Sequence, residues 1–215
     1  MNALYDQLAA LLEQGHREDI PDLLSDARFA HAERTADAAV LIAVTARPFG
    51  LKQRSDRPDF DGPGVILTQR PQDMRNHPGQ VAFPGGKIDP GENAVQAALR
   101  EAEEELALHR EHVRVIGTTD RYRTGTGFDV TPVLAVIPPD LDLTPNPHEV
   151  EDWFEAPLSL LLQRENWTEQ EVFWKGEMRQ YLEMHYKGFR IWGVTAAIIA
   201  NLSRRIGHEG LFDER

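Results

Sequence analysis

The chain has 215 residues, 41% of them hydrophobic, which is enough for one substantial core, and its formal net charge is −12. This charge disfavours binding of long nucleic acids, and the absence of cysteine excludes disulfides, thiolate metal sites and cysteine nucleophiles. The first residues lack the basic start and apolar core of a secretory signal, and the longest apolar stretch, 191–202, is too short to span a membrane. We therefore expect a cytoplasmic protein without membrane contact.

The first part of the chain predicts a helix, a strand and a long loop. Leucines recur at helical spacing near the start: Leu4, Leu8, Leu11 and Leu12. Residues 38–44 form an apolar run that is typical of a buried strand. The stretch 48–64, rich in Pro, Gly, Asp and Arg, predicts a loop whose role the sequence leaves undefined. Extended structure resumes at 65–68.

The second part of the chain predicts further helices and strands. A helix is expected from Ala94 to Ala107, followed by strands at 113–117 and 130–137. The remaining predicted elements are two helical segments, at 153–162 and 192–206. This order is neither a regular alternation of strand and helix nor a helical bundle. We therefore predict one mixed α+β domain over residues 1–215.

The predicted helix from Ala94 to Ala107 carries three glutamates on one face: Glu101, Glu104 and Glu105. Residues three and four apart are neighbours on a helix, so we expect these carboxylates to lie together. Like charges so placed weaken a helix unless a cation offsets them. Carboxylate oxygens are typical ligands of Mg²⁺ and Mn²⁺, which complete their shells with water and substrate phosphates. The pattern predicts metal-assisted attack of water on a phosphoanhydride.

Acidic helix faces are more often plain solvated surface, and a run of glutamates alone does not indicate a metal site. Here a glycine turn at 83–86, Glu92 and Arg100 accompany the glutamates. The helix also has a separate apolar stripe: Val95, Leu99, Ala102 and Leu106. The centre of the stripe lies about a third of a turn from the glutamates, so one face can pack while the other binds metal.

The same residues carry a family resemblance. Gly86, Glu92 and the run 100–108 resemble the Nudix hydrolase signature at every fixed position except Ala107, where the family usually has glycine. Because a left-handed alanine costs roughly 1–2 kcal/mol, we expect a shifted or differently capped helix end. The resemblance implies a Nudix fold, an α/β/α sandwich in which a mixed β-sheet lies between helices, with a loop-helix-loop metal motif.

A second motif lies upstream of the helix: 66–70, Arg75, Gly79 and 83–86. It is similar to the motif of the coenzyme A pyrophosphatase branch of the family, from which it departs at Pro71 and, conservatively, at Ile66. Residues 190–196 also resemble that branch. The resemblance implies hydrolysis of the diphosphate bond of coenzyme A or acyl-coenzyme A to 3′,5′-ADP and (acyl-)4′-phosphopantetheine.

The resemblance further implies roles for single residues. The implied metal ligands are Glu101, Glu104, Glu105 and the carbonyl of Gly86, while Glu92 and Arg100 pair in structural support. The base that accepts the water proton stays open between Glu104 and Glu149, which lies in a distant loop. The catalytic candidates are Glu101, Glu104 and Glu149.

Four basic residues flank the metal helix in sequence: Arg70, Arg75, His77 and Lys87. They could offset the charge of a diphosphate substrate, and arginine suits bidentate phosphate contacts. The alternative for the two arginines is an ordinary surface ion pair. A lone loop histidine such as His77 is more often a simple hydrogen-bonding residue.

Two other functions stay open on the sequence alone. The chain could be a Nudix hydrolase of ADP-ribose, another nucleoside diphosphate derivative or nucleoside triphosphates, which a substrate panel distinguishes. It could also be a non-catalytic nucleotide-sensing module, although such a module should have lost metal ligands. The expected partner is a small nucleotide diphosphate, and a homodimer is expected by family analogy alone.

Overall fold

The fold is known from a computed structural model, which describes residues 1–21, 23–26, 36–48, 60–74, 77–174 and 177–207. Its helices are α1 (Asn2–His16), α2 (Ala94–Leu106), α3 (Leu158–Leu162) and α4 (Val194–Ile206), with short 3₁₀ turns η2 (Arg110–His112) and η3 (Arg164–Asn166). Among these described residues, no helix is both long and apolar enough to cross a membrane.

The main sheet has a mixed topology. Its strands are β1 (Ala36–Thr45), β2 (Gly64–Gln69), β3 (Val81–Ala82), β4 (Gly85–Lys87), β5 (Arg114–Thr118), β6 (Tyr122–Arg123), β7 (Phe128–Ile137) and β8 (Asp152–Pro157). The order is β3-β2-β1-β7-β5, and β4, β6 and β8 pair with β1, β7 and β2. Strands β1 and β7 run parallel from Ala36↔Phe128 to Thr45↔Ile137, while the other pairs are antiparallel.

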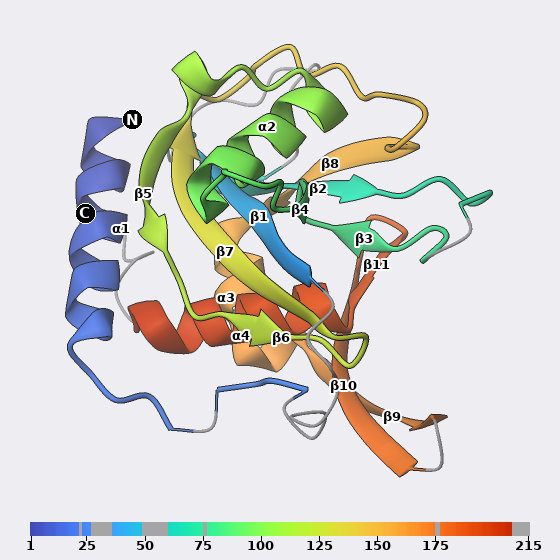
Figure 1. The fold of residues 1–215 in the computed structure, drawn as a ribbon. Helices are drawn as coiled ribbons and strands as arrows, with labels where there is room; N and C mark the ends of the chain where they lie inside the picture. Colours follow the sequence, from blue (N-terminus) through green and yellow to red (C-terminus); the bar gives the residue numbers. More distant parts are fainter. Residues whose placement is uncertain (22, 27–35, 49–59, 75–76, 175–176, 208–215) are drawn as a thin grey trace.

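Helices cover both faces of this sheet (Figure 1). Helix α2 packs on one face, where small side chains on both partners, such as Ala39 and Ala43 on β1 and Ala98 on α2, let the backbones approach closely. The opposite core contains residues of α1, α3 and α4, with Ile42 and Val44 of β1. Because β1 is buried on both faces, its sequence is a continuous apolar run. The predicted α/β/α architecture is confirmed.

A second sheet, which the sequence analysis did not predict, follows the main one. Strands β9 (Thr168–Trp174), β10 (Glu177–Tyr186) and β11 (Phe189–Trp192) form an antiparallel sheet in the order β11-β10-β9. The hairpin of β9 and β10 projects from the body in Figure 1. Buried Met184 and Ile191 join this sheet to the core that contains α4.

Most other predicted elements are confirmed, including the first helix, the four strands and the helix at the end of the chain. The helical prediction for 153–162 is wrong in its first half, because Asp152–Pro157 is strand β8. Its alternate residues Phe154 and Ala156 are buried, which is the two-residue period of a strand. Of the predicted loop 48–64, residues 49–59 lie outside the described part of the chain, and β2 already begins at Gly64.

The end of α2 differs from the expectation for Ala107. This alanine adopts the left-handed conformation, with φ 53° and ψ 30°, so the helix ends where a glycine would end it. The N–H of Ala107 donates to the carbonyl of Glu103 at 2.9 Å, and the N–H of Leu108 donates to the carbonyl of Ala102 at 3.3 Å. Leu108 is 1% exposed, so its burial after the turn stabilises the left-handed alanine. The predicted shift of the helix end is wrong.

Candidate active site

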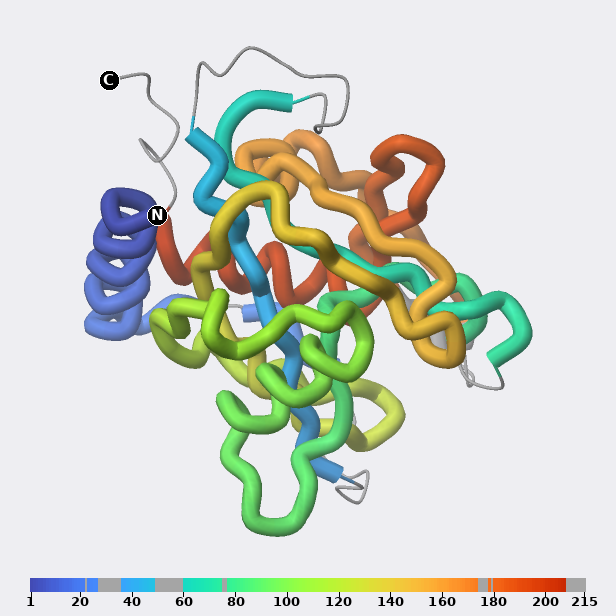
Figure 2. Tube along the Cα trace, turned by 90° about the horizontal axis from the view of Figure 1, so that it is seen from above, coloured from blue at the N-terminus to red at the C-terminus, as the bar shows by residue number. Residues whose placement is uncertain are grey.

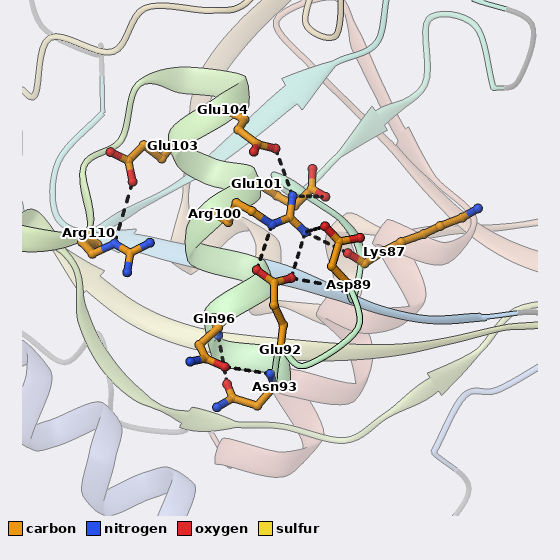
Figure 3. Close-up of polar contacts among 10 residues, drawn as sticks. All are labelled: Lys87, Asp89, Glu92, Asn93, Gln96, Arg100, Glu101, Glu103, Glu104 and Arg110. Carbon is orange, nitrogen blue, oxygen red and sulfur yellow. Dashed lines mark hydrogen bonds and ion pairs between the residues drawn. The ribbon is translucent and has the colours of Figure 1, made fainter.

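The start of α2 is fixed by side chains of its own first turn. The side chain of Asn93 accepts a hydrogen bond from the N–H of Gln96 at 3.0 Å, and the side chain of Gln96 accepts one from the N–H of Asn93 at 2.9 Å. This reciprocal pair is a capping box, visible at the lower end of the helix in Figure 3. It sets the helical register that carries the glutamates two turns later.

Arg100 connects the loop before the helix to the acidic face (Figure 3). Its Nε and Nη2 donate to the two carboxylate oxygens of Glu92 at 3.0 and 3.1 Å, and Nη2 also donates to the carbonyl of Lys87 at 3.0 Å. Its Nη1 donates to Glu101 and to Glu104, each at 3.0 Å. The hydrogen bonds from Arg100 lower the pKa of Glu92. The structure thus brings Glu92 and Arg100 together, as a support for the turn would require.

Glu105 lies on the buried side of the same helix. Its side chain is 7% exposed, and its Oε2 has no hydrogen-bond partner among the described residues. Burial raises the pKa of Glu105 to about 8, and the like charges of Glu101 and Glu149 add to this, against the N–H of Gly85 and the charge of Arg70. A buried carboxylate oxygen without a donor carries a large desolvation cost, which a cation would offset.

Gly86 lies directly against Glu101. A Cβ atom at this position would sit 2.3 Å from Oε1 of Glu101, so a larger residue here would push this carboxylate out of its present position. Burial raises the pKa of Glu101, although the hydrogen bond and charge of Arg100 act in the opposite direction. The turn and the helix therefore share one crowded, acidic corner.

Glu149 reaches the same corner from the loop between β7 and β8. Within that loop the N–H of Asn146 donates to the carbonyl of Glu105 at 2.8 Å, and the carbonyl of Asn146 accepts from the N–H of Glu149 at 3.0 Å. The charge of Glu149 raises the pKa of both Glu101 and Glu105, so its carboxylate lies within electrostatic range of both. Among the described residues, its own carboxylate makes no hydrogen bond or ion pair.

The predicted basic residues are placed differently from one another. Arg70 follows β2, its charge lowers the pKa of Glu105, and its Nε is buried without a hydrogen-bond partner in the described part of the chain. His77 is an exposed residue at φ 55°, in a turn. The side chain of Lys87 extends away from the glutamates in Figure 3, and its Nζ lies 5.9 Å from the ring centroid of Phe128. Arg75 lies outside the described residues.

The segment that carries Arg70 is held from two sides. The N–H of Arg70 donates to the carbonyl of Gln80 at 3.0 Å, and the carbonyl of Arg70 accepts from the N–H of Gly79 at 3.1 Å. These two hydrogen bonds close the loop between Arg70 and Gly79. Thr195 at the start of α4 donates its hydroxyl to the carbonyl of Val81 at 2.9 Å. The C-terminal helix therefore supports strand β3, at the end of this loop.

The acidic corner fits a divalent cation, although its three helix glutamates do not converge. Within the described residues, no three acidic or histidine side chains form a ready coordination shell. The reason is that Arg100 holds Glu101 and Glu104, while Glu105 is buried and accepts a hydrogen bond from the N–H of Gly85. The prediction that the three carboxylates lie together as a ready set of metal ligands is therefore wrong for this structure. The orphaned oxygen of Glu105 and the hard oxygen donors around it still suit Mg²⁺ or Mn²⁺.

Two features of the site escaped the sequence analysis. The capping box of Asn93 and Gln96 has a readable signature, because a capping residue followed three positions later by glutamine precedes the helix. The role of Asn146 in joining its loop to α2 has no such signal, since the contact spans about forty residues of sequence to Glu105. Only the fold brings these two segments together.

Comparison with known proteins agrees with this geometry. The NUDIX domain family matches residues 57–175. A protein of Escherichia coli (strain K12), named "Uncharacterized Nudix hydrolase NudL", is 40% identical over 171 residues, covering 79% of this chain and 82% of the relative. The corresponding protein of Shigella boydii is 39% identical over the same length.

Among solved structures, the Nudix hydrolase RenU of M. smegmatis matches with a TM-score of 0.52 at 23% identity, covering 84% of this chain and 90% of that one, a likeness of fold. Nudix hydrolases generally need divalent metal ions and act on small nucleotide substrates. The chain belongs to the Nudix family and is a pyrophosphohydrolase.

Proposed function

We propose that the chain is a Mg²⁺- or Mn²⁺-dependent hydrolase of coenzyme A or acyl-coenzyme A. The products would be 3′,5′-ADP and (acyl-)4′-phosphopantetheine. The observation that carries this proposal is Arg70, the last residue of the motif segment 66–70, with a buried Nε that has no partner in the described residues. Its charge already acts on Glu105, so a diphosphate bound there would meet both the guanidinium and the metal site.

We assign Glu105 and Glu101, with the carbonyl of Gly86, as the residues that hold the cation, and Glu104 as a further ligand. When bound, the cation would neutralise charge on the diphosphate and lower the pKa of a bound water. Arg100 holds Glu101 and Glu104 in place and anchors the glycine turn through the carbonyl of Lys87.

Glu149 is our preferred acceptor of the water proton. Glu104 already accepts a hydrogen bond from Arg100, whereas the carboxylate of Glu149 makes none among the described residues and lies in range of Glu101 and Glu105. A general base must be able to reach the water that it deprotonates. Glu149→Gln should therefore lower kcat at least as strongly as Glu104→Gln does.

The test of the substrate is a panel assay with product identification by mass. Purified protein with Mg²⁺ or Mn²⁺ should release 3′,5′-ADP from coenzyme A. The rival is another Nudix specificity, and the same panel includes ADP-ribose, a nucleoside diphosphate sugar and a nucleoside triphosphate. A much higher kcat/KM for ADP-ribose than for coenzyme A would reject the proposed substrate.

The test of the metal face uses matched variants of one helix. Glu104→Gln should remove most turnover and leave the thermal unfolding profile unchanged. Glu103→Gln is the control, because Glu103 faces His109 and Arg110 on another side of the helix (Figure 3). Full activity of Glu104→Gln would exclude its metal role.

We propose that residues 1–215 act as a single Nudix domain in the cytoplasm, on a small nucleotide diphosphate and without membrane or long nucleic-acid partners. The net charge of −12 supports the last point. A homodimer is tested by light scattering during gel filtration.

A further inference from the structure

The loop at 138–151, between β7 and β8, links two distant places in the molecule. In Figure 2 it runs beside α2, and its course takes it from the end of β7 to the end of β2. Along the way the N–H of Thr144 donates to the carbonyl of Leu106 at 2.9 Å. At the far end the N–H of Glu151 donates to the carbonyl of Gln69 at 2.8 Å. Glu149 therefore lies on a segment held at both α2 and β2.

The first half of the loop is anchored by Arg47, at a place far from Glu101 and Glu105. Arg47 follows β1, and its side chain is only 6% exposed. Its Nη1 donates to Asp140 at 2.9 Å and its Nη2 donates to Glu155 on β8 at 2.9 Å. One buried guanidinium thus ties the loop to the sheet. The anchor lies in a cavity of about 590 Å³ whose walls include Leu141 and Trp153.

Asp140, which accepts from Arg47, has an unusual backbone conformation. Its φ is 60°, in the left-handed region that favours glycine. Aspartate tolerates this region better than most residues, but glycine adopts it without strain. Aspartate therefore combines a tolerated left-handed backbone with the carboxylate that Arg47 binds.

We infer that Asp140, held by Arg47, is a positioning residue that fixes the loop at 138–151 and thereby the place of Glu149 relative to Glu101 and Glu105. The inference rests on the proposed function only in giving Glu149 a part in the reaction. The mechanical part stands on the contacts alone: Asp140 to Arg47, Thr144 to Leu106, and Asn146 to both Glu105 and Glu149.

The path between Asp140 and Glu149 is short and tightly bonded. Leu141 and Leu143 pack against the core on the α2 face, and Val150, next to Glu149, is 2% exposed. The carbonyl of Asn146 accepts from the N–H of Glu149 and from that of Val150. We expect a loop packed in this way to shift as a unit when its first anchor is lost, and misplacement of a catalytic group by about 1 Å can cost up to about 100-fold in rate.

The test is Asp140→Gly, which removes the carboxylate and relieves the left-handed strain at once, so the fold should persist. We expect kcat to fall about 10-fold, with KM and the metal concentration for half activity within about twofold of the wild type. Asp140→Asn should restore at least half of kcat, because its amide oxygen can still accept from Arg47. The matched control is Asp142→Gly, which removes the same charge two residues along and should leave kcat unchanged.

A second measurement does not depend on turnover. Hydrogen exchange of the metal-free protein should be faster in the peptide that contains Thr144 and Asn146 for Asp140→Gly, and normal for Asp140→Asn and Asp142→Gly. Unchanged exchange, or equal loss of kcat in Asp140→Gly and Asp142→Gly, would overturn the inference. Absence of coenzyme A hydrolysis by the wild type would instead reject the proposed substrate, and kcat would then be measured on the best substrate of the panel.

Discussion

The carboxylates around helix α2 differ in whether they have a positively charged partner. On one side Arg100 is surrounded by carboxylates that it pairs with, and Glu92 has a lowered pKa as a result. On the other side Glu105 is buried, one of its oxygens has no donor in the described residues, and its pKa is raised to about 8. Arg100 supports the turn and holds Glu101 and Glu104 in place, whereas Glu105 has the buried, perturbed carboxyl that is typical of functional sites.

The largest difference in activity is expected between a variant of Glu105 and a variant of Glu92, the partner of Arg100. Glu105→Gln should lower kcat about 100-fold or more, because it removes a charge that would bind the metal. Glu92→Gln should cost about 10-fold, because Arg100 keeps its bonds to Glu101 and Glu104. Steady-state kinetics at saturating Mg²⁺ measure both. Equal losses in the two variants would mean that the two sides do not differ in function.

A second prediction concerns the glycine between the two sides. Gly86→Ala should weaken metal binding about 10-fold, because its Cβ would lie 2.3 Å from Oε1 of Glu101. Calorimetric titration with Mn²⁺ gives the affinity. Gly117→Ala is the control, since a Cβ there meets only Leu12 at an ordinary 3.6 Å. Tight Mn²⁺ binding by the Gly86 variant would show that Glu101 has room to move.

A third prediction concerns the dependence of stability on pH. Glu105 ionises near 4.5 when unfolded and near 8 in the folded, metal-free protein. Between these values the folded state keeps a proton that the unfolded state has lost, so the free energy of unfolding falls as pH rises, by at most about 1.4 kcal/mol per pH unit. Urea unfolding at several pH values measures this slope. Glu105→Gln should flatten it, and an equal slope in that variant would assign the effect elsewhere.

The smallest effect is expected at the end of the helix. Ala107→Gly should raise the free energy of unfolding by about 1 kcal/mol, because glycine adopts φ 53° without the strain of a Cβ atom. Ala94→Gly, at the first position of the same helix, should lower it instead. Thermal unfolding compares the two. A loss of stability in the Ala107 variant would mean that the alanine side chain packs more favourably than its backbone is strained.

The sequence predicts the pairing of Glu92 with Arg100, which the structure contains, but not the bonds from Arg100 to Glu101 and Glu104. These residues lie within about one helix length of one another, so local geometry alone accounts for the contacts of Arg100. The burial of Glu105 could not be predicted in the same way, because it depends on β4 and on the loop of Asn146. The same limit explains the missed sheet of β9 to β11, whose pairing is set by neighbours, and the strand mistaken for a helix at Asp152–Pro157.

The unpartnered oxygen of Glu105 also bears on how much enzyme a cell would keep. On the proposed assignment, ion binding adds to the stability of the native chain by mass action, and the gain grows with the supply of free ion. Starvation for the ion would leave more chains transiently open to proteases, so abundance would follow metal supply without any dedicated regulator.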